Sequence, residues 1–169
     1  MDLLNQIFFA LALLLTVVAM SRMLSRPYTG AELSIDDRLY KALLLLFALA
    51  AITVRVWEFG TVPGGFNQDG AMAAVDAKAL ADYGTDHYGM SLPVHLTAWG
   101  YGQMSALLSY LMVPFIKLMG LNAVSARLPQ LIISLLGLAA LYLFSRDAFG
   151  KKAALVVFAF GSIAPWHIL

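Results

Sequence analysis

The chain has 169 residues, of which 61% are hydrophobic and 12% are charged, and its mean hydropathy is +0.79. Because a soluble domain that faces water on every side is about 25% charged, this composition predicts an integral membrane protein whose main partner is the lipid bilayer. The net charge of +1 offers no basic field for nucleic acid, and the absence of cysteine excludes disulfides, thiolate nucleophiles and cysteine-ligated metal centres.

The first expected membrane span covers residues 3–21. The run from Leu3 to Met20 is interrupted by only three polar side chains, and about 20 apolar residues are needed to cross a bilayer as a helix. No Lys or Arg precedes this run, and no small-x-small cleavage site follows it. We therefore expect a retained anchor and not a signal peptide.

A second span is expected at residues 42–58. The connection before it, Arg22 to Lys41, holds four basic residues, which places that connection in the cytoplasm by the positive-inside rule. Arg55, Trp57 and Glu58 lie near the far end of the span, where they can snorkel or pair at the interface. The chain then leaves the membrane on the outer side.

An acidic external loop is expected at residues 60–123. Within it, Asn67-Gln68-Asp69 followed by an alanine-rich stretch predicts a capped helix at about 69–83, which Gly84 ends. Asp69, Asp76 and Tyr83 recur every seventh residue and so share one face of this helix. We expect Asp76, together with Asp82, on the solvated face.

The segment at about 103–119 is apolar and long enough to cross the membrane, although it contains Pro114 and Lys117. If it crossed, the next span would carry the basic connection from Arg146 to Lys152 to the outside, against the positive-inside rule. We therefore interpret this segment as an interfacial or re-entrant helix. Two further spans are expected at 125–145 and 153–169.

These elements predict an all-α integral membrane fold. It consists of about four transmembrane helices in one transmembrane domain, residues 1–169, with two juxtamembrane helices in the external loop. We found no internal repeat, and no ionisable residue in the middle of a span that would mark an ion path.

Four residues of the loop and the span after it are candidates for chemistry. Asp69 can act as a general base, although an acid in the first turn of a helix ordinarily satisfies backbone N–H groups and the helix dipole. His87 and Tyr88 follow Asp86, either as part of a proton-transfer pair or as a plain turn, and one His with one Asp is too few groups for a metal. Arg127 can bind a lipid phosphate through two donors or serve as an interfacial anchor.

The order of several Pro- and Gly-containing motifs along the chain resembles that of a known family. They are Pro63-Gly64-Gly65-Phe66-Asn67-Gln68-Asp69, then Gly84-Thr85-Asp86-His87-Tyr88-Gly89 with Pro93, Pro114 and Gly120, then Ser125-Ala126-Arg127-Leu128-Pro129 and Ala164-Pro165-Trp166-His167. From about Arg38 to Leu169 this order resembles the N-terminal part of bacterial family 39-like glycosyltransferases. These enzymes belong to the membrane-embedded C superfamily and are related to protein O-mannosyltransferases and aminoarabinose transferases.

The resemblance implies a multi-pass protein of the bacterial cytoplasmic (inner) membrane with the acidic loop outside. Asp69 matches the family's catalytic base on the first juxtamembrane helix, and the implied donor is a polyprenyl-phosphate-linked sugar, transferred with inversion and without a cofactor. His87, Tyr88 and Arg127 are then candidate substrate contacts. Gly70 stands where the family usually has a glutamate, which removes one acidic group from the expected site.

Two functions stay open at this point. Members of the family are several times longer and build the donor pocket from later spans, so the chain is expected to be the N-terminal part of such an enzyme. The alternative is a non-catalytic, shortened glycosyltransferase-like subunit of a larger membrane protein complex. Small residues would let helices of partner subunits approach closely: Gly137, Ala139, Ala140, Gly161 and Ser162.

Overall fold

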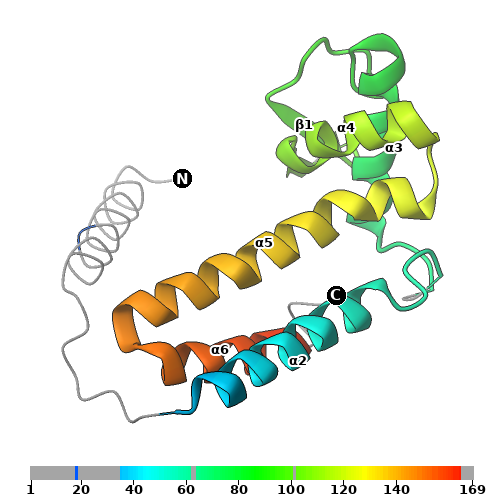
Figure 1. Cartoon of the computed structure of the whole chain (residues 1–169). Coiled ribbons are helices and arrows are strands. Elements are labelled where there is room, and N and C mark those ends of the chain that lie inside the picture. Colours follow the sequence, from blue (N-terminus) through cyan, green and yellow to red (C-terminus); the bar gives the residue numbers. More distant parts are fainter. Residues whose placement is uncertain (1–17, 19–34, 62–63, 101, 165–169) are drawn as a thin grey trace. The chain divides into compact units, whose positions relative to one another are not determined.

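The computed structural model describes residues 18, 35–61, 64–100 and 102–164. Apart from residue 18, the first expected span lies outside the described residues, and so does the end of the fourth, residues 165–169. The described residues are mostly helical (Figure 1), with helices α2 (Asp37–Val56), α3 (Gln68–Tyr83), α4 (Leu107–Met119), α5 (Ala123–Phe149) and α6 (Lys151–Ile163).

Helices α2 and α5 are long and apolar enough to cross a membrane, with 20 and 27 residues. Only 17% of the apolar window of each helix is buried within the structure, so most of their side chains are left for lipid or other helices to cover. The described part of α6 has 13 residues, too few to cross alone, since about 20 are needed. Two candidate spans are therefore present in the described residues, and four stay a prediction.

An antiparallel hairpin lies between α3 and α4. Strand β1 (His95–Ala98) pairs with β2 (Gly102–Ser105), and the helix expected from about 103 begins instead at Leu107. The reason is local, because Trp99 and Gly100 have φ angles of 56° and 78° and so turn the chain back on itself. Leu96 and Ala98 are buried on alternate positions of β1, which is the period of a strand. This short sheet was not part of the all-α expectation.

The structure divides into two compact units, and the first contains the described residues 35–51 and 137–164. Its core consists of Ala51, Leu138 and Phe158, with Tyr142 against them. The hydroxyls of Tyr40 and Tyr142 lie 2.6 Å apart, which ties the start of α2 to α5. A Cβ at Gly161 would lie 2.6 Å from the Leu138 Cδ1 atom, so this small residue serves packing within the chain.

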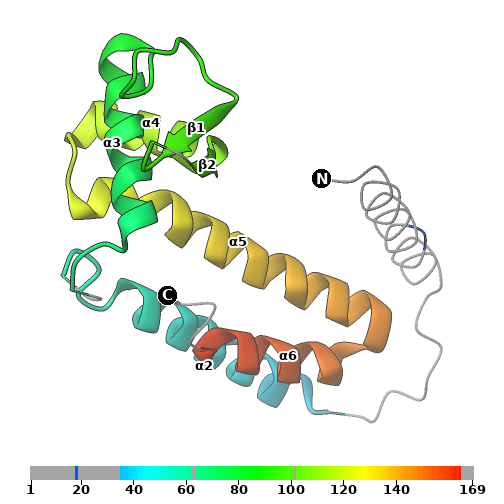
Figure 2. The same cartoon turned by 180° about the vertical axis from the view of Figure 1, so that it is seen from behind.

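The second unit holds the described part of residues 52–136 and contains the loop between α2 and α5 (Figure 2). Its core joins small residues of α3, including Ala73 and Ala77, to Met112 and Ile116 of α4. Ser109, fully buried in α4, donates a hydrogen bond of 2.9 Å to the carbonyl of Ala73. The alanines of α3 therefore let α4 approach closely enough for this bond. The candidate site residues all belong to this unit.

Candidate functional site

Asp69 lies in the first turn of α3 but does not cap the helix. The N-cap is Asn67, whose backbone is extended and whose side-chain oxygen accepts the N–H of Gly70 at 2.6 Å. Asp69 is exposed, and within the described residues its carboxylate makes no hydrogen bond or ion pair. Because Asn67 already accepts a backbone N–H of the first turn, the structural role left for Asp69 is a favourable interaction with the helix dipole. Its carboxylate is accessible to a substrate.

Gly70 follows Asp69 where the resemblance would place a glutamate. A Cβ at this position would lie 2.7 Å from the Asn67 Oδ1 atom, which is closer than side chains pack, and 3.4 Å from the Phe66 ring. A larger residue at this position would therefore require the Asn67 carboxamide to shift. Gly70 and the Asn67 cap are therefore parts of one local arrangement.

Arg127, close to the start of α5, binds the loop that leads from α2 into α3. Its Nη1 donates to the carbonyl of Phe59 at 3.1 Å and its Nη2 to the carbonyl of Gly65 at 2.7 Å. The guanidinium carbon also lies 4.9 Å from the centre of the Phe66 ring, within the range of a cation–π contact. Arg127 thus holds the segment that delivers the chain to Asn67 and Asp69. Binding of a lipid phosphate by Arg127 stays a prediction.

Asp76 is buried, which corrects the expectation that it lies on the solvated face. Its side chain is 0% exposed, and its Oδ1 accepts the backbone N–H of His87 at 3.0 Å and lies 2.5 Å from His87 Nδ1. The chain after α3 folds back over Asp76, as its contacts with His87 show. The two ends of α3 are not covered in this way: Asp69 is exposed, and Tyr83 is 79% exposed. Asp82 is exposed as expected and pairs with Lys78 at 2.5 Å.

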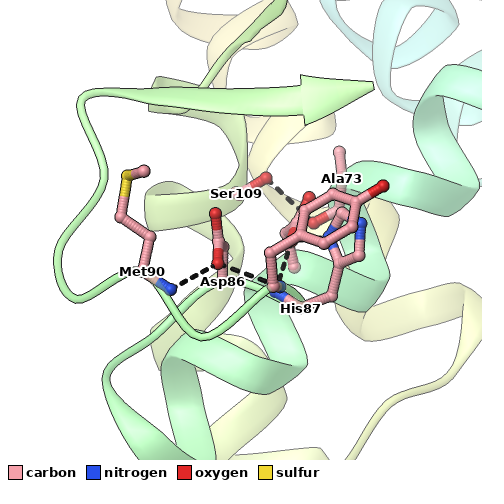
Figure 3. Close-up of polar contacts among 7 residues, drawn as sticks. Ala73, Asp86, His87, Met90 and Ser109 are labelled. Atoms are coloured by element: carbon pink, nitrogen blue, oxygen red, sulfur yellow. Dashed lines mark hydrogen bonds and ion pairs between the residues drawn. The ribbon is translucent and has the colours of Figure 1, made fainter. Parts of the chain in front are cut away.

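The loop that covers Asp76 is a tight turn built on Asp86. Figure 3 shows the Asp86 carboxylate among backbone donors: its Oδ1 accepts the N–H of Tyr88 at 3.0 Å and of Met90 at 2.8 Å. Asp86 is 3% exposed, and its carboxylate stabilises the turn through these bonds. His87 pairs with Asp76 and not with its sequence neighbour Asp86. The turn interpretation of Asp86 therefore describes the structure better than an Asp86–His87 proton-transfer pair.

His87 and Tyr88 present two rings beside each other. Their centroids are 4.0 Å apart with planes inclined by 42°. The side chain of His87 is 25% exposed, and Tyr88 is 61% exposed. His87 Nε2 and the Tyr88 hydroxyl have no hydrogen-bond partner in the part of the chain that the structure describes. Both polar atoms are therefore available at the surface.

The structure brings the candidates together in two groups. Arg127 is linked to the segment before Asp69, and His87 with Tyr88 is linked to Asp76. The two aspartates lie seven residues apart on α3, which is about 10 Å of helix. Among the described residues, no group of three His, Asp or Glu side chains is placed to hold a metal ion.

Sequence reasoning missed Asp76 and Ser109, although a signal for Asp76 was present. Ala73, Ala77 and Leu80 repeat at the spacing of a buried helical stripe, and Asp76 falls within it. A charged residue inside such a stripe needs a partner, because burying an unpaired charge is costly. That partner is the imidazole and backbone N–H of His87, which no local pattern indicated.

Comparison of the chain with known proteins gives no match to a family model, to a curated protein or to a solved structure. Functional inference therefore depends on the chain's own residues and their geometry.

Proposed function

We propose that the chain forms the N-terminal membrane part of a glycosyltransferase. The enzyme would move a sugar from a polyprenyl-phosphate donor to an acceptor at the outer face of a bacterial inner membrane. The observation that carries this proposal is the carboxylate of Asp69, which is exposed and without a partner in the described residues at the start of a helix whose cap is Asn67. Asp69 follows the candidate span α2 closely, where a lipid-linked substrate would present its head group.

The reaction assigns Asp69 the role of general base. A nucleophilic oxygen or nitrogen of the acceptor would attack the anomeric carbon of the donor sugar while its proton passes to the Asp69 carboxylate. The bond between the anomeric carbon and the phosphate oxygen breaks, and the polyprenyl phosphate leaves with the bonding electrons. Attack opposite the leaving group inverts the anomeric centre. His87, Tyr88 and Arg127 are the candidate substrate contacts.

The proposal places the external loop on the outer side of the membrane, in a multi-pass chain. Because the chain has no cysteine, single cysteines can report this directly. In intact cells we expect a membrane-impermeant maleimide to label Tyr83→Cys in α3. Lys151→Cys, which follows α5, should react only after the cells are opened. Labelling of both positions, or of Lys151→Cys alone, would contradict this orientation.

Transfer itself is tested with the complete protein purified in lipid nanodiscs. Polyprenyl-phosphate sugars with a radiolabelled sugar are offered together with a membrane extract as the source of acceptors, and nucleotide sugars serve as the control donors. We expect label to leave the polyprenyl-phosphate donor in a protein-dependent manner and no label to leave the nucleotide sugars. Failure with every polyprenyl-phosphate sugar, in a protein that co-purifies with other membrane subunits in a fixed ratio, would favour the non-catalytic subunit instead.

A further inference from the structure

The loop after α3 holds an imidazole that its surroundings orient. Asp76, buried in α3, contacts both the backbone N–H and the Nδ1 of His87 through its Oδ1 atom. The Oδ2 atom of Asp76 is buried and has no hydrogen-bond partner among the described residues. Among the described residues, His87 is therefore the residue that provides the hydrogen-bond partners of the buried Asp76 carboxylate.

This contact bears on which nitrogen of His87 carries the proton. A carboxylate in its ionised form can only accept hydrogen bonds, and next to such a carboxylate the proton of His87 would be on Nδ1. In the neutral imidazole the other nitrogen, Nε2, then keeps its lone pair. Because Nε2 has no partner in the described part of the chain, it is an unused acceptor at the surface.

The charges around His87 select the kind of group that could bind there. Asp76 contacts the Nδ1 atom of the imidazole, Asp86 precedes His87 in the sequence, and Lys78, two residues after Asp76 on α3, is paired with Asp82. Such surroundings repel phosphate and other anions. A neutral hydroxyl that donates to Nε2 meets no such penalty. The exposed ring of Tyr88 beside it offers an apolar surface with a polar tip.

We propose that His87 and Tyr88 form a subsite for a neutral sugar ring. His87 Nε2 accepts a hydrogen bond from a ring hydroxyl, Tyr88 contacts the apolar face of the ring, and Asp76 is a positioning residue that acts through His87. This inference rests on the proposed function. Because about 10 Å of helix separates Asp76 from Asp69, the bound ring is not the one that reacts but a further unit of the donor or of the acceptor.

The test uses the whole chain in nanodiscs of zwitterionic lipid, with ¹⁵N-labelled histidine observed by NMR at alkaline pH. We expect the His87 spectrum to show the proton on Nδ1. Methyl hexosides and methyl pentosides, added one at a time, should shift the His87 Nε2 resonance for at least one of them, and inorganic phosphate should not. A proton on Nε2, no shift with any glycoside, or an equal shift with phosphate would overturn the subsite.

Variants assign the binding to these residues. His87→Ala should weaken glycoside affinity about fivefold, the loss expected for one hydrogen bond, while His95→Ala, an exposed histidine on β1, should leave affinity unchanged. Equal affinity in His87→Ala and the parent would refute the assignment. His87→Gln keeps an acceptor on the side chain and should retain part of the affinity that His87→Ala loses.

The positioning role of Asp76 has a readout of its own. Asp76→Ala should shift the His87 proton toward Nε2 and weaken glycoside affinity as much as His87→Ala does, although the imidazole is still present. An unchanged tautomer in a folded Asp76→Ala protein would refute this role. If that variant does not fold, the tautomer in the parent protein, which needs no variant, still decides it.

The KM values of the transfer reaction show whether the bound sugar ring belongs to the donor or to the acceptor. In the transfer assay, His87→Ala should raise KM for the acceptor if the bound ring belongs to the acceptor, and KM for the donor if it belongs to the donor. Glycoside binding without any transfer would contradict the proposed function and leave the subsite standing. Transfer with both KM values unchanged in His87→Ala would contradict the subsite and leave the proposed function standing.

Discussion

Replacing Asp69 with asparagine is expected to lower sugar transfer by about 10²- to 10⁴-fold, the range that a general base contributes. Asparagine has nearly the shape of aspartate but cannot take a proton from the acceptor. Since Asn67 caps α3 and Asp69 makes no hydrogen bond within the described residues, the fold loses almost nothing. We expect the free energy of unfolding to change by less than about 0.5 kcal/mol. The measurement is initial-rate transfer in nanodiscs, with thermal unfolding followed in parallel.

A matched control lies on the same helix. Asp82→Asn removes an exposed carboxylate from the last turns of α3 and breaks only the exposed pair with Lys78, so transfer should stay close to the parent rate. Asn67→Ala should lower stability and not the capacity for proton transfer. It removes the cap at a cost of about 1 kcal/mol, while the Asp69 carboxylate remains. Full transfer in Asp69→Asn, or equal losses in Asp69→Asn and Asp82→Asn, would exclude Asp69 as the base.

Much of the helical framework could be predicted from the sequence, because it depends on local signals. The apolar run that became α2, the Asn67 cap and the Gly84 stop of α3, and the apolar run of α5 each act within one element. A bilayer-spanning helix needs only length and apolar composition, and both are properties of a segment. The hairpin at 95–105 was missed because its turn depends on a left-handed Trp99, a conformation that tryptophan rarely adopts.

The candidate site was harder to predict, because its contacts join residues that are distant in the sequence. Asp69 was found from its place after a Gly-rich entry, which is local. The bond between Asp76 and His87 arises only when the loop after α3 folds back, and the bonds from Arg127 to Phe59 and Gly65 arise only when α5 meets the loop between α2 and α3. Periodicity predicted a solvated position for Asp76, because it cannot tell which part of a helix a distant segment covers.

Arg127→Leu is expected to destabilise the second unit by about 2 kcal/mol and to lower transfer at least about tenfold. The substitution removes two hydrogen bonds from a charged donor and leaves the carbonyls of Phe59 and Gly65 without their partner. The expected loss of stability is modest, because the bond to Gly65 is exposed and water can replace part of it. The loss of transfer follows because the freed segment leads directly into Asn67 and Asp69, and small displacements of a catalytic group are costly.

A conservative variant and a distant control test this structural role. Arg127→Lys keeps the charge but lacks the planar fork that reaches two carbonyls at once, so it should recover only part of the stability. Arg146→Leu, which removes an exposed arginine paired with the adjacent Asp147, should change the free energy of unfolding by less than about 0.5 kcal/mol.

The same variants separate the two roles open to Arg127, a clamp on the loop and a ligand for lipid phosphate. If Arg127 acts as a clamp, Arg127→Leu lowers the unfolding temperature and reduces kcat, because the base is misplaced. If it binds the donor phosphate, the unfolding temperature stays unchanged and KM for the polyprenyl-phosphate sugar rises. The two carbonyl bonds and the Phe66 contact favour the first outcome, since they already engage both ends of the guanidinium. A rise in donor KM with unchanged stability would refute the clamp.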